Sequence, residues 1–412
     1  MNVLWITNIL LPEIAAHLSG DGVVRASGGW LSSLSEVLER ECDINLAVAT
    51  VSGRVDHLVD YRGVNTRYFV IPSKTSVYNY SRKTEKYWEK INEMFRPNVV
   101  HIHGTEYPFG LAYTNVCGAN KVVVSIQGMP TELAKYCKGG ISNYTLLKNA
   151  TLRDLVKSVF HEVHNMKMSG KWERLLLRKV NHVIGRTSWD RAHALAINPE
   201  VKYHVCNESL REPFYTGEWV YEKCHKHTIF VSQFHCPMKG FHILIKAMSL
   251  IKRSYPDIKV IVAGWDILKN DGFRGRLRTS GYAKYIRKEI KKYRLEDSIV
   301  RTGPLNADDM KRALLDANVY VCTSSIENSP NSLGEAQVLG VPCVASFVGG
   351  IPDMMKGMEN NLYRFDDEVM LSDKICEVFL KGEAAAYDNS TYVARHNREE
   401  NLKQLLSIYQ SV

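Results

Sequence analysis

The feature that most constrains the fold is an alternation of short apolar runs with helical patterns, which occurs twice along the chain. In the first half, the apolar runs are rich in β-branched residues and suit strands that are buried on both faces. These runs are 2–8, 44–50, 67–71, 98–103, 121–126 and 182–186. Amphipathic patterns over 27–40 and 84–95 predict helices between them. Strands and helices that alternate in this way predict a parallel sheet with helices on both faces.

The same alternation restarts after residues 203–227, a stretch without a clear period that we interpret as a linker. Further strands are predicted at 227–232, 258–264, 298–303, 317–323 and 341–346. Further helices are predicted at 240–255, 282–293, 306–317 and 396–410. We therefore predict an α/β protein with two doubly wound domains. In such sheets ligands bind beyond the carboxyl ends of the strands, and the cleft between two such domains is the default site.

Composition narrows the setting in which the chain works. Its 412 residues suffice for two or three domains with their own cores. Nine cysteines without a C-x-x-C pair argue against a disulfide framework or a zinc knuckle and favour a reducing cytosol. The start MNVLWITNILLPE lacks the features of a signal peptide, and no apolar run approaches the roughly 18 residues that span a bilayer. We expect a cytoplasmic protein.

The net charge of +9 is unevenly distributed. Residues 131–180 contain ten Lys or Arg against four Asp or Glu. Within them, residues 143–180 mix cations with Leu, Val, Phe, Met and Trp, the composition of a helix that lies on anionic lipid. The alternative is a helical face packed on its own domain with solvated charges. Nucleic acid is not expected as a partner, because the excess is moderate and no aromatic–basic motif accompanies it.

One short stretch, SIENSPNSLGEAQVLGVPCVASFVGG (325–350), carries the clearest chemical signal. Glu327 follows a predicted strand, and Glu335 lies inside the next predicted helix. Amides at the start of that helix favour phosphate, and a carboxylate one turn deeper can bind two vicinal hydroxyls. The residues of this helix start are Ser329, Asn331, Ser332 and Leu333. The pattern indicates a nucleotide-sugar pocket; the alternative is that both glutamates are solvated residues at a helix end.

The same stretch resembles the E-x7-E signature of retaining glycosyltransferases of family four, which have the GT-B architecture. The match includes ENSPNSLGEA and GVPCVAS followed by VGGIPD. Other landmarks follow in the family's order: SGGW (27–30), VVHIHG (99–104), VVVSIQG (122–128), VIGRTSWDRA (183–192) and FVSQFHCPMKGFHILIKA (230–247). The resemblance covers essentially the whole chain. It implies two Rossmann-like domains facing each other across a cleft, with the C-terminal helix crossing back onto the first.

The resemblance also implies roles for individual residues. Glu335 corresponds to the glutamate that binds the donor ribose, and Glu327 to the one that lies against the donor sugar or the reacting centre. Lys239 corresponds to the lysine that neutralises the donor diphosphate, a task that suits a compact ammonium group. Gly28 and Gly29 correspond to the loop whose bare backbone approaches diphosphate and acceptor; the alternative is a simple turn before a helix.

The sequence departs from the family pattern at two places. Ser232 and Gln233 stand where the family usually has a Gly-Arg pair, so one cation over the diphosphate is replaced by another residue or Lys239 acts alone. Gln127 stands where the family often has His. Gln127 can hydrogen-bond a sugar hydroxyl but cannot titrate. It is compatible with retention, because the leaving phosphate can take the acceptor proton.

Other polar residues follow predicted strands of the first domain. His103 is a candidate catalytic group, with a hydrogen-bonded core histidine as the alternative, and His101 points to the same face. Arg186 is a candidate phosphate ligand, with pairing to Asp190 as the alternative. The chain has no D-x-D triplet and no His or Cys at ligand spacing, so we expect no metal and no cofactor.

These observations predict an acceptor-binding domain over 1–205 with 396–412, a linker over 206–225 and a donor domain over 226–395. The expected activity is metal-independent transfer from a nucleotide sugar, with a UDP-sugar favoured, to a saccharide or lipid-linked acceptor in cell-surface polysaccharide synthesis. The enzyme would be cytoplasmic and peripheral at the inner face of the membrane. The alternatives are another GT-B nucleotide-sugar enzyme, such as an epimerase or a synthase, and a non-catalytic scaffold that binds a sugar nucleotide.

Overall fold

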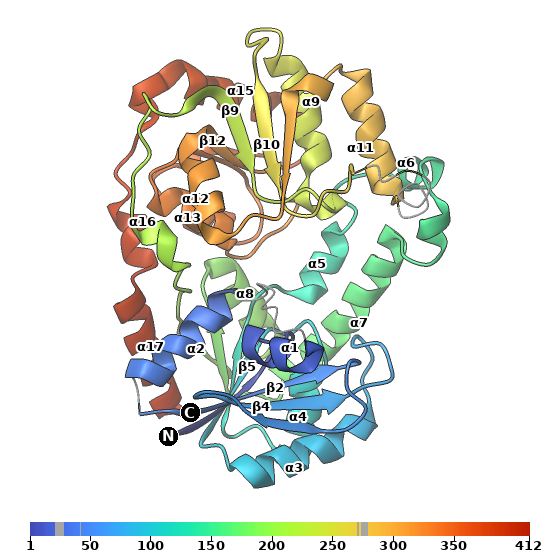
Figure 1. Ribbon diagram of the computed structural model, residues 1–412, viewed down its shortest axis with the longest axis vertical. Helices are drawn as coiled ribbons and strands as arrows, with labels where there is room; N and C mark the ends of the chain where they lie inside the picture. The colour runs from blue at the N-terminus through green and yellow to red at the C-terminus, as the bar shows by residue number, and fades with distance from the viewer. Residues whose placement is uncertain (21–28, 42, 270–271, 273–278) are drawn as a thin grey trace. The chain divides into compact units, whose positions relative to one another are not determined.

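The computed structural model describes residues 1–20, 29–41, 43–269, 272 and 279–412 (Figure 1). Its internal contacts divide the chain into two compact units. The first unit comprises Met1–Ala134, Asn165–Arg211 and Asn397–Val412. The second unit comprises Lys135–His164 and Glu212–His396. Each unit holds a sheet of its own, as the two rounds of alternation predict.

The first unit contains an eight-stranded sheet in the order β3-β4-β2-β1-β5-β6-β7-β8. Its strands are β1 (Asn2–Ile6), β2 (Asn45–Ser52), β3 (Val59–Arg62), β4 (Arg67–Pro72), β5 (Val99–His103), β6 (Val122–Ser125), β7 (His182–Gly185) and β8 (Lys202–Val205). All neighbouring strands are parallel except β3, which pairs antiparallel with β4. The strand order reverses between β1 and β5, and such switch points are where open α/β sheets bind ligands.

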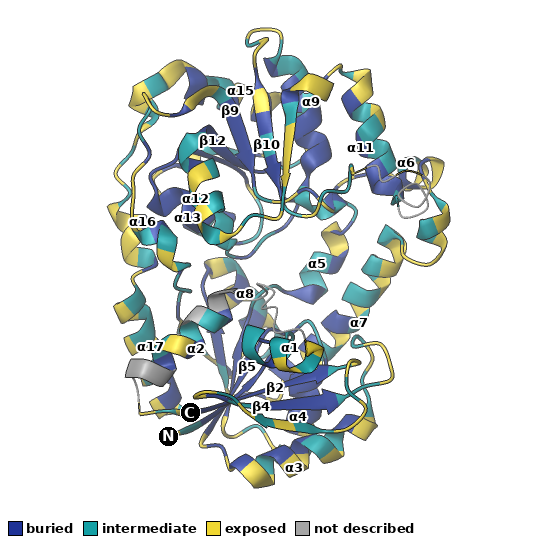
Figure 2. Ribbon diagram, viewed as in Figure 1, coloured by how far each residue is buried: buried dark blue, intermediate teal, exposed yellow. Residues whose placement is uncertain are grey.

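Both faces of this sheet are buried, which explains why its strands are continuous apolar runs. Along β1, Leu4 and Ile6 belong to one hydrophobic cluster. Val3 and Trp5 alternate with them and belong to a second cluster on the opposite face. Figure 2 shows the inner strands β2, β4 and β5 of this sheet as largely buried.

Helices cover the two faces of the first sheet. They are α1 (Pro12–Ser19), α2 (Gly29–Glu41), α3 (Glu85–Phe95), α4 (Phe109–Cys117), α8 (Ser188–Ile197) and α17 (Arg398–Ser411). The C-terminal helix α17 belongs to this unit, as expected from the predicted fold. Its Tyr409 hydroxyl accepts a hydrogen bond from Trp5 Nε1 at 3.0 Å, so the end of the chain is fixed to the central strand.

The second unit contains a six-stranded parallel sheet in the order β11-β10-β9-β12-β13-β14. Its strands are β9 (His225–Val231), β10 (Lys259–Ala263), β11 (Ile299–Gly303), β12 (Ala317–Cys322), β13 (Cys343–Ser346) and β14 (Leu362–Tyr363). Its helices are α6 (Asn143–Lys148), α9 (Phe241–Ile251), α11 (Gly281–Lys292), α12 (Ala307–Asp316), α13 (Asn331–Val338), α14 (Ile351–Met354), α15 (Glu368–Lys381) and α16 (Ser390–Arg395). The switch point of this sheet lies between β9 and β12.

Residues 135–164 were expected in the first domain, but the structure groups them with the second unit. The physical reason is hydrophobic: Ile141 and Leu146 are buried in the core cluster of the second sheet. Two helices extend across the boundary in sequence, α5 (Pro130–Tyr136) and α7 (Val159–Leu177). The expected linker 206–225 is also divided. Residues 206–211 group with the first unit, and Trp219 is buried in the second, where its Nε1 donates to Ala317 O at 2.8 Å.

Some elements were not predicted. Helix α1 lies in a region expected to be a loop, although Pro12 at its first turn and Gly20 after its end are ordinary helix signals. Gly20 has φ +68°, the left-handed conformation that ends many helices. The edge strands β3 and β8 were missed because short, partly exposed strands have weak periodicity. Helix α4 was missed because it is short and buried over Phe109–Thr114, so it has little amphipathic pattern.

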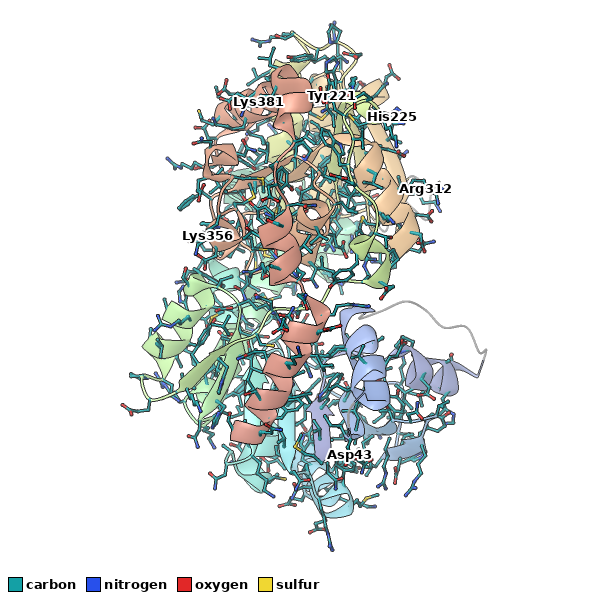
Figure 3. The ribbon with its side chains drawn as sticks, turned by 90° about the vertical axis from the view of Figure 1, so that its left-hand side faces the viewer. Asp43, Tyr221, His225, Arg312, Lys356 and Lys381 are labelled. Atoms are coloured by element: carbon teal, nitrogen blue, oxygen red, sulfur yellow. The ribbon has the colours of Figure 1, made fainter. Side chains whose placement is uncertain are left out.

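Charged side chains cover the outside of the second unit. Arg312, Lys356 and Lys381 are exposed there, and each carries part of the chain's positive excess (Figure 3). Within the described residues, no helix has both the length and the apolar character needed to cross a bilayer.

Candidate functional site

In the second unit, an ion pair lies beyond the carboxyl ends of β9 and β12. Lys239 ends the 3₁₀ turn Pro237–Lys239, which follows β9, and Glu327 lies in the loop between β12 and α13. Lys239 Nζ lies 2.5 Å from Glu327 Oε1. Ser324 Oγ donates to the same oxygen at 2.7 Å. The two charged side chains are 20% and 17% exposed, so the pair is accessible to a ligand at the switch point.

Two opposing effects act on the pKa of Lys239. Burial lowers it, while the charge of Glu327 and its hydrogen bond raise it, and the net direction is upward. Lys239 is therefore an ammonium group at neutral pH. A compact cation at this position can stabilise negative charge on a phosphate.

The backbone around this pair requires glycine at two positions. Gly240, directly after Lys239, has φ +69°, and a Cβ there would lie 1.7 Å from Thr323 O. Gly349 has φ +51°, and a Cβ there would lie 1.9 Å from Glu327 O. The amide of Gly350 donates to the same Glu327 oxygen at 3.0 Å. The two glycines that close the 325–350 stretch therefore hold the loop that carries Glu327.

Helix α13 brings together the other predicted residues of this stretch. Glu335 lies in the helix and is buried, with 3% exposure. Ser332 Oγ lies 3.1 Å from Ser232 Oγ and 2.9 Å from the Tyr320 hydroxyl, which joins the helix start to the ends of β9 and β12. The Leu333 amide donates to Pro330 O at 3.0 Å, so it is already used within the turn. Asn331 is the first residue of the helix.

One basic residue near the start of α13 was missed by sequence reasoning. Arg395, at the end of α16, has its Nη2 atom 3.5 Å from Ser329 Oγ. The positions where a Gly-Arg pair was expected carry no cation, and Gln233 is exposed. Arg395 is the last residue before a chain turn into α17, and no local pattern in the sequence links it to residue 329. Its position makes it a candidate for the missing second cation.

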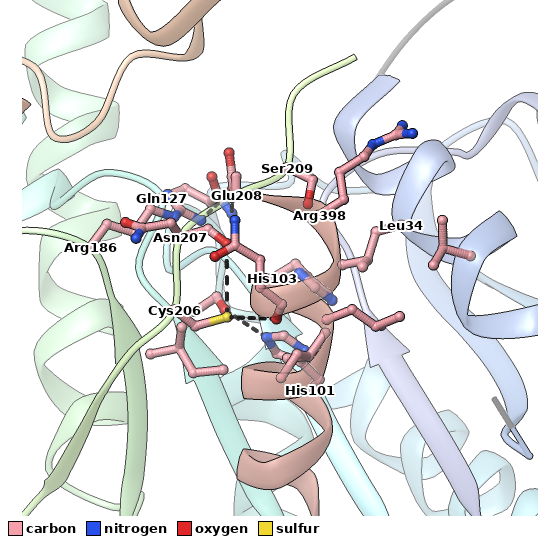
Figure 4. Close-up of a pocket in the computed structure, with 16 residues that line it drawn as sticks. Leu34, His101, His103, Gln127, Arg186, Cys206, Asn207, Glu208, Ser209 and Arg398 are labelled. Atoms are coloured by element: carbon pink, nitrogen blue, oxygen red, sulfur yellow. Dashed lines mark hydrogen bonds and ion pairs between the residues drawn. The ribbon is translucent and has the colours of Figure 1, made fainter. Parts of the chain in front are cut away.

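In the first unit, a pocket of about 70 Å³ lies beyond the ends of β5, β6 and β7 (Figure 4). His103 ends β5, Gln127 follows β6 by two residues, and Arg186 follows β7 directly. The structure thus brings three predicted site residues of the first domain into one pocket. Leu34 and Val37 of α2 and Leu402 and Leu405 of α17 contribute an apolar side.

The two histidines of this pocket are buried and uncharged. His101 Nε2 lies 2.6 Å from Ser125 Oγ, and His101 Nδ1 lies 2.7 Å from the Tyr409 hydroxyl. The ring of His103 lies 3.8 Å from the ring of His101, centroid to centroid. Burial and the charge of Arg186 lower the pKa of His101 to about 3. Burial, with the neighbouring His101 ring and the charge of Arg186, lowers the pKa of His103 well below its usual value, so His103 is a weak base here.

Glu208 is the functional candidate that sequence reasoning missed in this pocket. Its Oε1 accepts a hydrogen bond from Gln127 Nε2 at 3.0 Å and forms an ion pair with the Arg186 guanidinium. Figure 4 shows Gln127, Arg186 and Glu208 gathered at one end of the pocket. Glu208 falls in the stretch interpreted as a linker, where an acidic residue without a surrounding pattern gave no signal.

The expected alternative partner of Arg186, Asp190, binds the backbone of Arg186. The Asp190 carboxylate accepts hydrogen bonds from the backbone amides of Arg186 and Thr187, at 3.0 and 3.3 Å, and caps α8. Asp190 therefore fixes the backbone of Arg186, and the guanidinium pairs with Glu208. Of the remaining predicted residues, Gly29 begins α2, and Gly28 lies outside the described residues.

Comparison with known proteins matches the second unit to a family. Residues 222–389 match the family described as glycosyl transferases group 1. The putative glycosyltransferase YtcC of Bacillus subtilis is 31% identical over 121 residues, which is 29% of this chain and 28% of that protein. The putative colanic acid biosynthesis glycosyltransferase WcaL of Salmonella typhimurium is 28% identical over 146 residues, or 34% of this chain and 32% of that protein. These matches span about a third or less of the relatives' length.

The fold is similar to that of solved structures over the whole chain. The crystal structure of Anabaena Alr3699/HepE in complex with UDP-glucose aligns with a TM-score of 0.64 at 13% identity, and the alignment covers 100% of both chains. This likeness supports the predicted architecture of two Rossmann-like domains.

Proposed function

We propose that the chain is a retaining glycosyltransferase, on the premise that its residues 222–389 match the family of glycosyl transferases group 1. It would move a sugar from a nucleotide-sugar donor to a saccharide or a lipid-linked acceptor. The observation that carries this proposal is the accessible Lys239–Glu327 pair at the switch point of the second sheet, with Glu335 in the helix that follows.

Each of these residues has a task that its chemistry fits. The Lys239 ammonium binds the donor diphosphate and stabilises the charge that develops as the sugar–phosphate bond breaks. Glu327 accepts hydrogen bonds from the donor sugar and keeps Lys239 oriented. Glu335 binds the ribose hydroxyls. Arg395 supplies the second cation beside the start of α13, in place of the arginine that is absent at Gln233.

The proposed chemistry makes modest demands on a protein base. The bond between the anomeric carbon and the phosphate oxygen breaks, and a bond to the acceptor oxygen forms on the same face. The leaving phosphate takes the acceptor proton. Gln127 and the uncharged His103 then need only position hydroxyl groups by hydrogen bonding, which suits the lowered pKa of His103.

A UDP-sugar is the favoured donor, and polysaccharide synthesis is the favoured pathway class. The first is supported by the UDP-glucose bound to Anabaena HepE, and the second by the likeness to WcaL. We further propose that transfer needs no metal, because Lys239 and the helix start take the place of a cation. The enzyme would work in the cytoplasm at the inner face of the membrane, with membrane contact within 143–180.

The test is a thermal-shift panel with UDP-, GDP- and ADP-sugars, each with magnesium and with EDTA. A ligand that binds only the folded state stabilises it by mass action, so about 100 Kd of donor stabilises by about 2.7 kcal/mol. We expect a rise in melting temperature with UDP-sugars, unchanged by EDTA and lost in Glu335→Ala. Glu383→Ala, an exposed change in the same unit, is the matched control and should keep the shift.

The outcomes separate the proposals. A shift for GDP- or ADP-sugars alone would replace UDP as the donor, and a shift lost in EDTA would contradict metal independence. Equal shifts in wild type and Glu335→Ala would remove the ribose assignment. No shift with any nucleotide sugar would contradict the donor site itself.

A second candidate is another nucleotide-sugar enzyme, such as an epimerase or a synthase, or a scaffold that binds the donor without turnover. Gln127 and Gln233 differ from the residues that the family usually has, and this difference is compatible with a scaffold that has lost turnover. Slow hydrolysis of the donor by the wild type, absent in Glu327→Ala, would argue against a scaffold.

A further inference from the structure

Residues 135–164 present an unusual concentration of exposed apolar side chains. Leu147, Leu152, Leu155 and Val156 are 64%, 68%, 76% and 81% exposed, and Tyr144 is 73% exposed. Large aliphatic side chains in water are ordinary when they are scattered singly. Here they follow one another over 13 residues of α6 and the 3₁₀ turn Leu152–Leu155.

Buried side chains and hydrogen bonds hold this segment on the second unit, so its exposed side chains are not the result of loose packing. Ile141 and Leu146 are buried in the core of the second unit. Thr151 Oγ1 donates to Thr279 O at 2.8 Å, and Lys288 Nζ donates to Asn149 Oδ1 at 2.7 Å. Figure 1 shows α6 beside α11, the helix that carries Lys288. The segment therefore turns one set of apolar residues inward and presents a second set to solvent.

Cations alternate with the exposed apolar residues. Lys148, Arg153 and Lys157 lie among them, and no carboxylate within the described residues forms an ion pair with any of the three. The one acidic residue in this stretch, Asp154, is already used. Its Oδ2 accepts hydrogen bonds from the amides of Thr151 and Gly281, both at 2.8 Å. Three cations against one carboxylate leave the stretch with a net charge of +2 beside its apolar side chains.

An exposed tryptophan extends the same surface. Trp265, after β10, is 76% exposed and lines one open pocket of about 680 Å³ together with Arg153 and Lys157. Its neighbour Asp266 pairs with Arg301 at 3.0 Å, so that carboxylate does not neutralise the cations of the pocket. Tryptophan, leucine and valine beside lysine and arginine form the composition that partitions into the headgroup region of a bilayer.

We propose that this surface, formed by Tyr144, Leu147, Lys148, Leu152–Lys157 and Trp265 and here called the 144–157 surface, docks the second unit on anionic lipid. Aliphatic side chains would enter the headgroup boundary, and the three cations would attract the anionic lipid phosphates. This docking surface rests on the membrane contact proposed above for 143–180 and gives it specific residues, whose exposure and charge do not depend on the proposed sugar transfer. It places membrane contact on the second unit, to which residues 135–164 belong.

The test is co-sedimentation of the full chain with vesicles of phosphatidylglycerol and phosphatidylcholine, compared with vesicles of phosphatidylcholine alone. We expect binding to the anionic vesicles that weakens as salt rises, because the lipid charge is screened. Leu152→Ser/Leu155→Ser/Val156→Ser should weaken binding more than about tenfold. Arg153→Gln/Lys157→Gln should weaken it by about fivefold for each charge removed and reduce its salt dependence.

A matched control replaces exposed aliphatic residues that lie outside the 144–157 surface. Val64→Ser/Val369→Ser/Leu380→Ser changes three aliphatic residues that are 87%, 63% and 78% exposed outside the surface. It should leave vesicle binding unchanged. All variants are first compared by circular dichroism and melting temperature, since these exposed changes should not unfold the protein.

Three outcomes would overturn the proposal. The first is no binding of the wild type to anionic vesicles. The second is equal loss of binding in the surface variant and in the control. The third is a change of oligomeric state in the Leu152/Leu155/Val156 variant without an effect on vesicles, which would assign the surface to a second copy of the chain. The donor thermal shift of each variant is measured in parallel, so a failure of the donor site is distinguished from a failure of membrane docking.

Discussion

Both units place an acid–base ion pair beyond the carboxyl ends of their strands, but they surround it differently. In the second unit, the side chains of Lys239 and Glu327 are 20% and 17% exposed. In the first unit, those of Arg186 and Glu208 are 5% and 13% exposed, and two uncharged histidines lie in the same pocket. The second site offers an accessible charge, which suits a diphosphate. The first offers a more enclosed and nearly neutral set of hydrogen-bonding groups, which suits the hydroxyls of a sugar.

If this contrast is functional, the largest effect on turnover should come from the accessible pair. Glu327→Gln keeps the shape of the side chain and removes its charge. We expect kcat to fall by about 10²–10³-fold, the size of losing one group that is specific to the transition state, while the donor Kd changes less than about threefold. Kinetics with the donor identified by thermal shift, and calorimetric donor titration, measure the two quantities.

Ser324→Ala provides the graded control for that experiment. It removes the hydrogen bond of 2.7 Å to Glu327 Oε1 but leaves both charges in place. We expect a loss of about tenfold in kcat, which corresponds to about 1.4 kcal/mol and lies near the lower end of what a hydrogen bond to a charged group contributes, about 1.5–3 kcal/mol. If Glu327→Gln weakened donor binding as much as turnover, Glu327 would be a binding residue only.

A buried carboxyl group in the first unit predicts that the stability of this unit depends on pH. Glu173 of α7 is fully buried; its carboxylate accepts from Thr105 Oγ1 at 2.7 Å and from the Thr131 amide at 3.1 Å. Burial raises the pKa of Glu173 to about 7, from 4.5. Between these values the folded state holds a proton that the unfolded state releases, so this contribution to stability is present below pH 4.5 and is lost as pH rises through 7.

Glu173→Gln should therefore gain stability relative to the wild type between pH 5 and pH 8. The expected gain is about 2–3 kcal/mol, at about 1.4 kcal/mol per pH unit over the titration range. Urea unfolding at both pH values measures it. Glu93→Gln, an exposed change in α3 of the same unit, is the matched control and should show a difference that does not vary with pH. A pH-independent difference for Glu173→Gln would show that this carboxyl titrates normally.

The contrast also explains what the sequence could predict. Glu327, Glu335 and Lys239 lie in local patterns of strand, turn and helix, and Gly349 is needed because a Cβ would lie 1.9 Å from Glu327 O. In the first unit, His103, Gln127 and Arg186 could be expected together because the carboxyl ends of parallel strands meet at one edge of a sheet.

Other features depend on contacts that no local pattern records. Glu208 follows the short edge strand β8 and reaches Gln127 and Arg186 over 81 and 22 residues of sequence. The period of 135–164 predicts helices but does not say which core receives Ile141 and Leu146. Arg395 reaches Ser329 across 66 residues. These placements follow from tertiary packing, which acts after the local elements are specified.

The smallest expected effect tests whether Arg186 and Glu208 are energetically coupled. Glu208→Gln removes the charge that faces the Arg186 guanidinium, and the guanidinium is then left in a site that is 5% exposed. We expect a loss of stability of about 1–2 kcal/mol, since a partly buried ion loses its partner.

Arg186→Gln should cost a similar amount. The double variant should cost less than the sum of the two, because neither charge is then left alone, and urea unfolding of all four proteins gives this coupling directly. Glu200→Gln, an exposed change in the same unit, should cost nothing measurable. Strictly additive losses would mean that solvent screens Arg186 and Glu208 as it does an exposed pair, and the two sites would then differ in sequence but not in electrostatic character.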